Sequence, residues 1–124
     1  MIDFEKAALL KLAPIDPREV ADTVGPLIIP GEELRAAFKT VRDFVVFTNK
    51  RVIAVNVQGM TGKKKDFTTL PYNKIQAFSV ETAGHFDMDA ELDLWFSGLG
   101  RVRFEFRGRS DVRGISQLIA SCML

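Results

Sequence analysis

The stretch RVRFEFRGRSDVRGISQLIASCM, residues 101–123, places a half-buried strand directly before an amphipathic helix. In its first part Val102, Phe104 and Phe106 alternate with charged residues, which is typical of a strand with one buried and one solvated face. Further along, Ser110 or Asp111 can cap a helix with its apolar residues on one side. Those apolar residues are Val112, Ile115, Leu118, Ile119, Cys122 and Met123. The strand and the helix therefore need a common apolar partner.

Six segments upstream have the composition and the turn spacing of short strands. They are residues 34–41, 43–48, 52–58, 66–70, 75–82 and 91–96, to which 101–107 adds a seventh. Tight turns at Asn49-Lys50 and between Gly98 and Gly100 join neighbours into hairpins. Seven meandering strands and one helix predict a mainly β barrel or roll, in which two near-orthogonal antiparallel sheets are capped by the C-terminal helix.

The first quarter of the chain has helical signals instead. Asp3 can cap an apolar helix that continues through Leu12 and ends before Pro14. Asp16-Pro17 is a second start, and the following Gly25-Pro26 ends a short helix over residues 17–24. We therefore expect a helical lead-in over residues 1–33 and a β domain over residues 34–124, folded as one structural unit.

The composition is that of an ordinary globular domain, with 124 residues, 47% of them hydrophobic and 27% charged. Its formal net charge of +1 gives no overall field that would attract nucleic acid. The acidic start and the short apolar runs fit neither a signal peptide nor a membrane span. The lone Cys122 fits a reducing compartment. We expect a cytoplasmic protein that binds no nucleic acid.

Three long motifs carry a resemblance to a known family. They are VVFTNKRVIAV at residues 45–55, QGMTGKKKDF at 58–67 and LPYNKIQAFSVETAGHFDMDAELDLWF at 70–96. Together they resemble the bacterial pleckstrin homology (PH) domain family over nearly the whole chain. The resemblance implies a PH-like fold and a ring-shaped homo-oligomer, a pentamer, formed through edge strands. It also implies protein–protein interaction at a polar surface where adjacent protomers meet.

Polar side chains gather in three segments that could form this surface. The candidates for partner binding are Thr48, Asn49, Lys50, Arg51, Gln58, Lys63, Lys64, Glu81, Thr82 and His85. Each segment has a plainer interpretation, because turns are polar and Asn often takes a positive φ. The glycines and lysines of residues 59–65 could alternatively hold a phosphate or an anionic lipid headgroup, which makes a peripheral membrane module the alternative function.

Trp95 is the candidate for the oligomer interface. Strict alternation from Leu92 to Phe96 turns its side chain outward, and Trp is enriched at binding hot spots. A bulge that returns Trp95 to the core is the alternative.

The sequence lacks the residue sets of an enzyme. It has one His and one Cys far apart, no nucleophile elbow and no phosphate-binding glycine fingerprint. The acids after His85, namely Asp87, Asp89 and Glu91, lack the glycine and the distal Glu of a calcium loop. We expect a non-catalytic binding protein without metal or cofactor.

Overall fold

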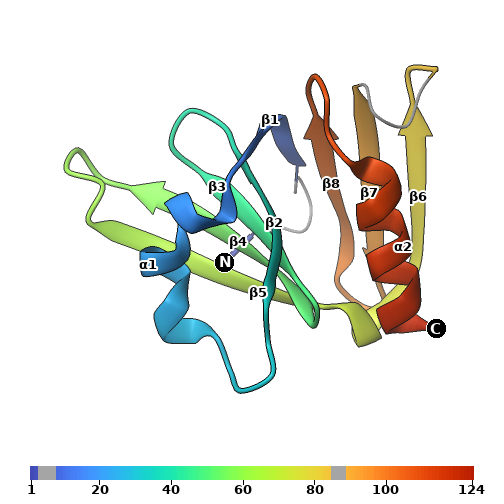
Figure 1. The fold of residues 1–124 in the computed structure, drawn as a ribbon, viewed down its shortest axis with the longest axis horizontal. Coiled ribbons are helices and arrows are strands. Elements are labelled where there is room, and N and C mark those ends of the chain that lie inside the picture. Colours follow the sequence, from blue (N-terminus) through green and yellow to red (C-terminus); the bar gives the residue numbers. More distant parts are fainter. Residues whose placement is uncertain (3–7, 85–88) are drawn as a thin grey trace.

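The structure, a computed structural model, describes residues 1–2, 8–84 and 89–124. Eight strands form one continuous sheet in the order β5-β4-β3-β2-β1-β8-β7-β6 (Figure 1). The strands are β1 (Ala8–Ile15), β2 (Leu34–Lys39), β3 (Phe44–Thr48), β4 (Arg51–Gln58), β5 (Lys64–Pro71), β6 (Ile75–Thr82), β7 (Ala90–Phe96) and β8 (Gly100–Phe106). The helix α2 (Val112–Met123) follows them.

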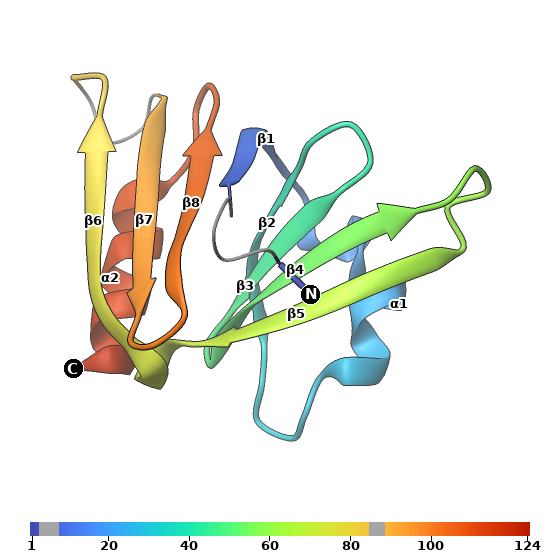
Figure 2. The same ribbon diagram turned by 180° about the vertical axis from the view of Figure 1, so that it is seen from behind.

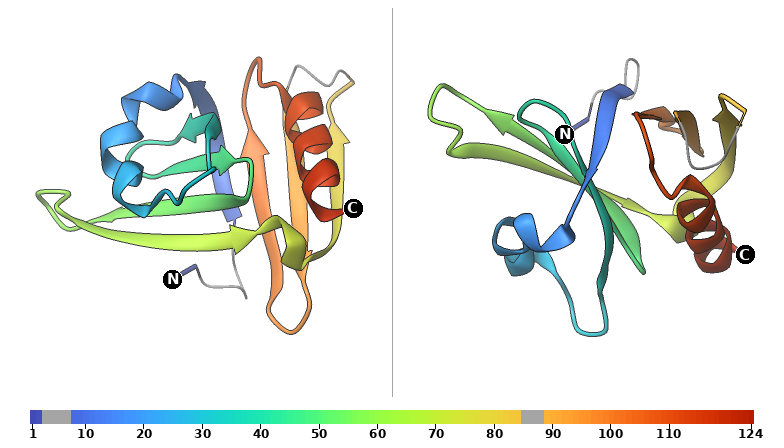
Figure 3. Two further views of the ribbon diagram at one scale, coloured as in Figure 1. Left: turned by 60° about the horizontal axis from the view of Figure 1, so that its bottom comes forward. Right: turned by 45° about the horizontal axis from the view of Figure 1, so that its top comes forward.

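The seven predicted strands are all present as β2 to β8, and none of their ends is displaced by more than two residues. β2 to β5 form one antiparallel meander, and β6 to β8 form a second. Figure 3 shows these two parts of the sheet inclined to one another, with α2 lying along the part that contains β6 to β8. The predicted mainly β, PH-like class with a terminal helix is confirmed. The prediction of seven antiparallel strands in two sheets is corrected, because an eighth strand, β1, pairs in parallel with β8 and joins the two meanders into one sheet.

The predicted first helix is wrong where the structure describes that segment, because Ala8–Ile15 is the strand β1. β1 lies between the two meanders, antiparallel to β2 and parallel to β8. Leu9 pairs with Phe104 and Leu12 with Phe106, and the register shifts between them. Lys11 has a φ of 58° at this irregularity. The extra residue gives two inward leucines a helix-like spacing of three, which explains the wrong prediction.

The short helix predicted over residues 17–24 is present as two pieces, the 3-10 turn η1 (Pro17–Glu19) and the helix α1 (Ala21–Val24). A second 3-10 turn, η2 (Gly25–Leu27), was not predicted and lies where Gly25-Pro26 was expected to end the helix. Asp16 caps η1 by accepting from the Arg18 amide at 2.9 Å. Val20 and Val24 pack against β2, β3 and β4 on the face opposite the main core. All five residues of β3 are buried, because the sheet is covered on both faces here. A doubly covered strand loses the clean alternation seen in β8.

The main core lies between the two meanders and α2. Its largest fully buried members are Tyr72 and several phenylalanines, and the ring centroids of Phe47 and Phe104 are 5.8 Å apart. α2 contributes Val112, Ile115 and Ile119, and Asp111 caps it by accepting from the Gly114 amide at 3.0 Å. In the described ranges, no helix combines the length and the apolar character needed to cross a bilayer.

Candidate functional site

The β3–β4 turn holds the first group of predicted residues, and Thr48 is at its centre. The Thr48 hydroxyl accepts from the amides of Lys50 and Arg51, each at 3.0 Å. It also donates to Glu32 at 2.7 Å. Arg51 Nε lies 2.9 Å from Glu32 Oε2, and its Nη2 lies 3.0 Å from Oε1. Thr48 and Arg51 therefore join the turn to the segment before β2.

The network contains a buried carboxylate whose charge depends on its hydrogen-bond donors. The Glu32 side chain is fully buried. Burial raises the pKa of its carboxyl, but hydrogen bonds from Arg51, from Thr48 and from a backbone amide outweigh that effect and hold the pKa below its ordinary value. The Tyr72 hydroxyl donates to the Thr48 carbonyl at 2.7 Å, and burial raises the pKa of the phenol. The polar groups are thus satisfied within the chain itself.

Asn49 and Lys50 complete the turn in different ways. Asn49 accepts from the Glu33 amide at 2.8 Å and donates to the Gly31 carbonyl at 3.0 Å. Cys122 of α2 lies 3.2 Å from the Asn49 carbonyl. Lys50 is exposed, and its ammonium group has no hydrogen bond or ion pair within the described residues. A cavity of about 520 Å³ opens beside these residues, so Lys50 is the group available to a ligand here.

The second group, Gln58, Lys63 and Lys64, lies at the other end of β4. Gln58 pairs with Lys64 across the hairpin. Lys63 and Lys64 are exposed, and the described part of the chain offers their ammonium groups no ion pair. β4 runs from Arg51 to Gln58, so roughly 23 Å of strand separates this group from the first.

The third group lies on the other meander. Glu81 and Thr82 end β6, and Glu81 stands in one cross-strand row with Glu91 and Glu105. A cavity of about 370 Å³ opens at this row. His85 falls outside the described residues. On one protomer the three predicted groups therefore occupy three separate places.

Trp95 points outward from a regular part of β7, as alternation predicts. It is 38% exposed and lies between Ala77 of β6 and Arg101 of β8. The irregularity in this pairing falls between Ile75 and Ala77, on β6. The neighbouring Asp93 accepts from Arg103 at 2.8 and 3.0 Å, and these hydrogen bonds raise the pKa of Arg103.

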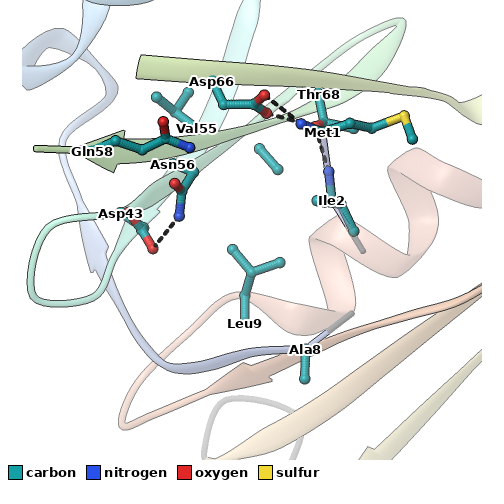
Figure 4. Close-up of a pocket in the computed structure, with 11 residues that line it drawn as sticks. Met1, Ile2, Ala8, Leu9, Asp43, Val55, Asn56, Gln58, Asp66 and Thr68 are labelled. Atoms are coloured by element: carbon teal, nitrogen blue, oxygen red, sulfur yellow. Dashed lines mark hydrogen bonds and ion pairs between the residues drawn. The ribbon is translucent and has the colours of Figure 1, made fainter. Parts of the chain in front are cut away.

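A further cavity of about 280 Å³ was not predicted. Residues 1–2, β1, β4 and β5 line it (Figure 4). Asn56 donates to Asp43 at 3.1 Å, and the Met1 amine pairs with Asp66. In β4 the buried apolar run of residues 52–55 is followed by the exposed Asn56, so a polar residue at the end of a buried run was the available signal.

Sequence reasoning also missed two exposed apolar side chains on neighbouring turns. Val41 is 90% exposed in the β2–β3 turn, and Met60 is fully exposed in the β4–β5 turn. The Arg42 guanidinium donates to the Gly59 carbonyl and so connects the two turns. An isolated apolar residue among turn residues gives no periodic signal, which is why these two were passed over.

Comparison with known proteins gives a consistent result. The family model for the bacterial PH domain matches residues 3–123. The uncharacterized protein YjqA of Bacillus subtilis (strain 168) is 46% identical over 107 residues, which cover 84% of this chain and 86% of YjqA.

Two solved structures are also similar to this chain. A DUF1696 family protein with a pleckstrin-homology domain from Shewanella loihica has a TM-score of 0.77 at 44% identity, covering 94% of this chain and all of that one. A pleckstrin homology domain from Shewanella amazonensis has a TM-score of 0.64 at 46% identity, covering 89% of this chain and 90% of that one. The chain therefore belongs to the bacterial PH domain family.

Proposed function

We propose that this chain is a non-catalytic scaffold that assembles into a ring-shaped homo-oligomer, a pentamer, and binds a protein partner at the polar junctions between protomers. One observation carries the proposal. The eight-stranded sheet begins with β5 and ends with β6, and both are eight-residue strands with one free edge.

The two free edges favour a ring over a simple dimer. Within the described residues, β5 pairs only with β4, and β6 pairs only with β7. An open edge presents unpaired N–H and C=O groups and is a template for another strand. When two different edges pair, the contact is head-to-tail, and such contacts close into a ring if the rotation allows. Figure 2 shows the sheet with β6 at one end and β5 at the other. A closed ring would leave neither edge open.

The charges at the two edges support an antiparallel contact. β5 begins with Lys64 and Lys65, whereas β6 ends near Glu81. Antiparallel pairing would set Lys64 of one protomer beside Glu81 of the next. Glu91 and Glu105 continue that acidic row. Such a contact would bring the second and third groups of candidate residues together, although they are apart on one protomer.

The non-catalytic part of the proposal rests on the sequence. One His and one Cys, far apart, do not supply a nucleophile with its base. The candidate turn supports the same view, because the buried Glu32 carboxylate accepts hydrogen bonds from both the Thr48 hydroxyl and the Arg51 guanidinium. These groups are therefore occupied by one another.

Size-exclusion chromatography with light scattering tests the ring. We expect a particle of five times the 13.9 kDa chain mass at micromolar concentration, and a monomer would refute the assembly. Lys64→Glu and Glu81→Lys should each lower the assembled fraction, and the double exchange should restore it. Arg109→Glu, which reverses a charge on an exposed residue outside both edge strands, is the matched control.

The partner is tested separately. Affinity capture from the native host should yield a protein that wild type retains and that Lys50→Glu or Lys64→Glu loses. Arg109→Glu should retain it. Equal capture by all four proteins would contradict a partner surface at these lysines.

A further inference from the structure

The cavity of about 520 Å³ beside Lys50 lies where four parts of the chain meet. Its walls are the segment before β2, the β3–β4 turn, the end of β5 with the 3-10 turn η3 (Tyr72–Lys74), and the last turn of α2. The end of α2 lies against η3 (Figure 1). We call this space the Lys50 cavity; residues from 29–32, 49–51 and 69–73 line it together with Cys122. Its volume falls within the range of about 300–1,000 Å³ that small-ligand sites occupy.

Hydrogen bonds hold the walls of the Lys50 cavity in place. The Arg51 guanidinium donates to the Leu27 carbonyl before β2 and to the Thr69 hydroxyl of β5, at 2.5 and 2.9 Å. It also pairs with the buried Glu32. Asn49 adds two hydrogen bonds to the backbone of the segment before β2. The cavity is therefore preorganised, and a ligand that enters it has little ordering of the walls to offset.

Most polar groups in these walls are already engaged. Each carboxylate oxygen of Glu32 accepts two hydrogen bonds. The Tyr72 hydroxyl donates to the Thr48 carbonyl. Within the described residues, the wall side chains that have no hydrogen bond or ion pair are those of Lys50 and Asn73, and both are exposed. The cavity therefore offers a ligand one ammonium group and one neutral amide.

This pair of donors suits a group with a single negative charge. An ammonium group and an amide N–H can each donate to one oxygen of a planar carboxylate. A phosphate carries more charge, and the sites that hold it present several backbone N–H groups or arginines. Here Arg51 is occupied by Glu32, and the C-terminal end of α2, which carries a partial negative charge, adjoins the wall. The charges therefore favour a carboxylate over a phosphate.

The Lys50 cavity also has an apolar side. Ile29 is 52% exposed and lines it, as does the half-buried ring of Pro71. The buried Tyr72 contributes to the same wall. A carboxylate alone would fill only a small part of about 520 Å³, so the remaining space can take a stem of several carbon atoms. Contact with these side chains would remove apolar surface of the stem from water.

We propose that the Lys50 cavity binds a carboxylate carried on a short apolar stem. Lys50 and Asn73 donate to its two oxygens, and Ile29 and Pro71 contact the stem. A free carboxylic acid and the C-terminus of a peptide that ends in an apolar residue present this same chemistry. The inference goes beyond the scaffold function and does not rest on the ring, because one protomer carries every residue of the site.

Alkylation of Cys122 by iodoacetamide tests the site on the full chain. Cys122 is the sole cysteine, is half-buried and lines the cavity, so a bound ligand should slow its alkylation. We expect hexanoate, or a tripeptide that ends in leucine, to slow the reaction roughly threefold or more at about 10 mM, a concentration suited to ligands of so few atoms. Hexanamide and the amidated tripeptide lack the negative charge and should not slow it, and neither should inorganic phosphate.

The two probes identify the source of the carboxylate. Protection by hexanoate would show that a free acid is sufficient, and protection by the tripeptide alone would point to a peptide C-terminus. Protection by neither probe would overturn the proposal. Equal protection by the amides or by phosphate would overturn it as well, because a carboxylate would then not be what the cavity selects.

Variants locate the contacts. Lys50→Gln should weaken probe affinity by about tenfold, since a hydrogen bond from a charged donor is lost, and Asn73→Ala should weaken it by about threefold. Lys50→Arg keeps the charge and should bind nearly as wild type. Lys74→Gln, an exposed residue of η3 outside the wall, is the matched control. Equal weakening by Lys50→Gln and Lys74→Gln would overturn the site, because general charge would then account for binding.

Each affinity is taken from the probe concentration that gives half the protection, so a change in the reactivity of the thiol itself does not affect it. Host capture and light scattering are measured on the same proteins. Capture of a partner that depends on Lys50, without probe binding, would overturn this site and leave the scaffold function standing. Probe binding by a chain that stays monomeric would support the site and overturn the ring alone.

Discussion

Arg51 and Glu32, nineteen positions apart in the chain, form a two-point ion pair in which each carboxylate oxygen accepts from a different guanidinium nitrogen. Arg51 also donates to the Leu27 carbonyl at 2.5 Å and to the Thr69 hydroxyl at 2.9 Å. One side chain therefore joins β4 to β5 and to the segment that precedes β2. The ion pair therefore stabilises the fold, and its contribution to the free energy of unfolding can be measured.

Replacing Glu32 should change how stability depends on pH. The folded pKa of Glu32 lies below 4.5, so the stability it contributes is present above that value and is lost as the pH falls toward the folded pKa. Glu32→Gln should remove this part of the acid slope and cost about 3 kcal/mol at neutral pH, because Arg51 loses its partner. Urea unfolding at a series of pH values measures both effects. Glu33→Gln, at an exposed neighbour, is the control, and parallel slopes for Glu32→Gln and wild type would contradict the prediction.

Tyr72→Phe tests the hydrogen bond that ends the β3 strand. The phenol donates to the Thr48 carbonyl at 2.7 Å and is fully buried. Its removal should lower the free energy of unfolding by about 1–2 kcal/mol. Ser79→Ala, which removes an exposed hydroxyl from β6, should stay within about 0.5 kcal/mol. If both substitutions changed the free energy of unfolding equally, the Tyr72 hydrogen bond would make no specific contribution to stability.

Lys11→Gly should stabilise the protein. Lys11 holds a φ of 58°, which costs a non-glycine residue roughly 1–2 kcal/mol. Part of that gain is offset because glycine has more freedom in the unfolded chain, so we expect a rise of about 0.5–1 kcal/mol in thermal or denaturant unfolding. Ala13→Gly in the same strand should instead lower stability by a similar amount. If Lys11→Gly lowered stability as Ala13→Gly does, the prediction that the positive φ of Lys11 is strained would be contradicted.

The fluorescence of Trp95 can report whether it lies between protomers. It is the sole Trp and is 38% exposed on the protomer, so acrylamide should quench it in dilute solution. If protomers meet at Trp95, quenching should fall over the same concentration range in which light scattering shows assembly. Trp95→Ala should then lower the assembled fraction. Assembly with unchanged quenching would place the interface elsewhere.

Much of the fold could be predicted because its strands carry local signals. β8 shows strict alternation of Val102, Phe104 and Phe106, and a change of period marks the start of α2. β1 was missed for a physical reason. Its extra residue at Lys11 puts Leu9 and Leu12 on one side at helical spacing, and the partners that reveal it as a strand lie far along the chain.

The candidate site was less predictable because side-chain partners depend on tertiary contacts. Thr48, Asn49 and Arg51 form a polar cluster in the sequence, yet Glu32, which engages two of them, lies well before the turn. The separation of Lys50 from Lys63 follows from the length of β4. Val41 and Met60 could not be selected, since exposure is a property of the folded surface.

The position of β1 has a consequence for how the protein is made. β1 is synthesised before β2 to β7, and its parallel partner β8 is synthesised after them. On the ribosome, the edge of β1 that pairs with β8 stays open until β8 has emerged, after all the other strands. Long-range closure of this kind belongs to slow folding, in the range of milliseconds to seconds. A nascent chain that pauses before residue 100 would expose the same strand edges that the mature protein buries at its centre.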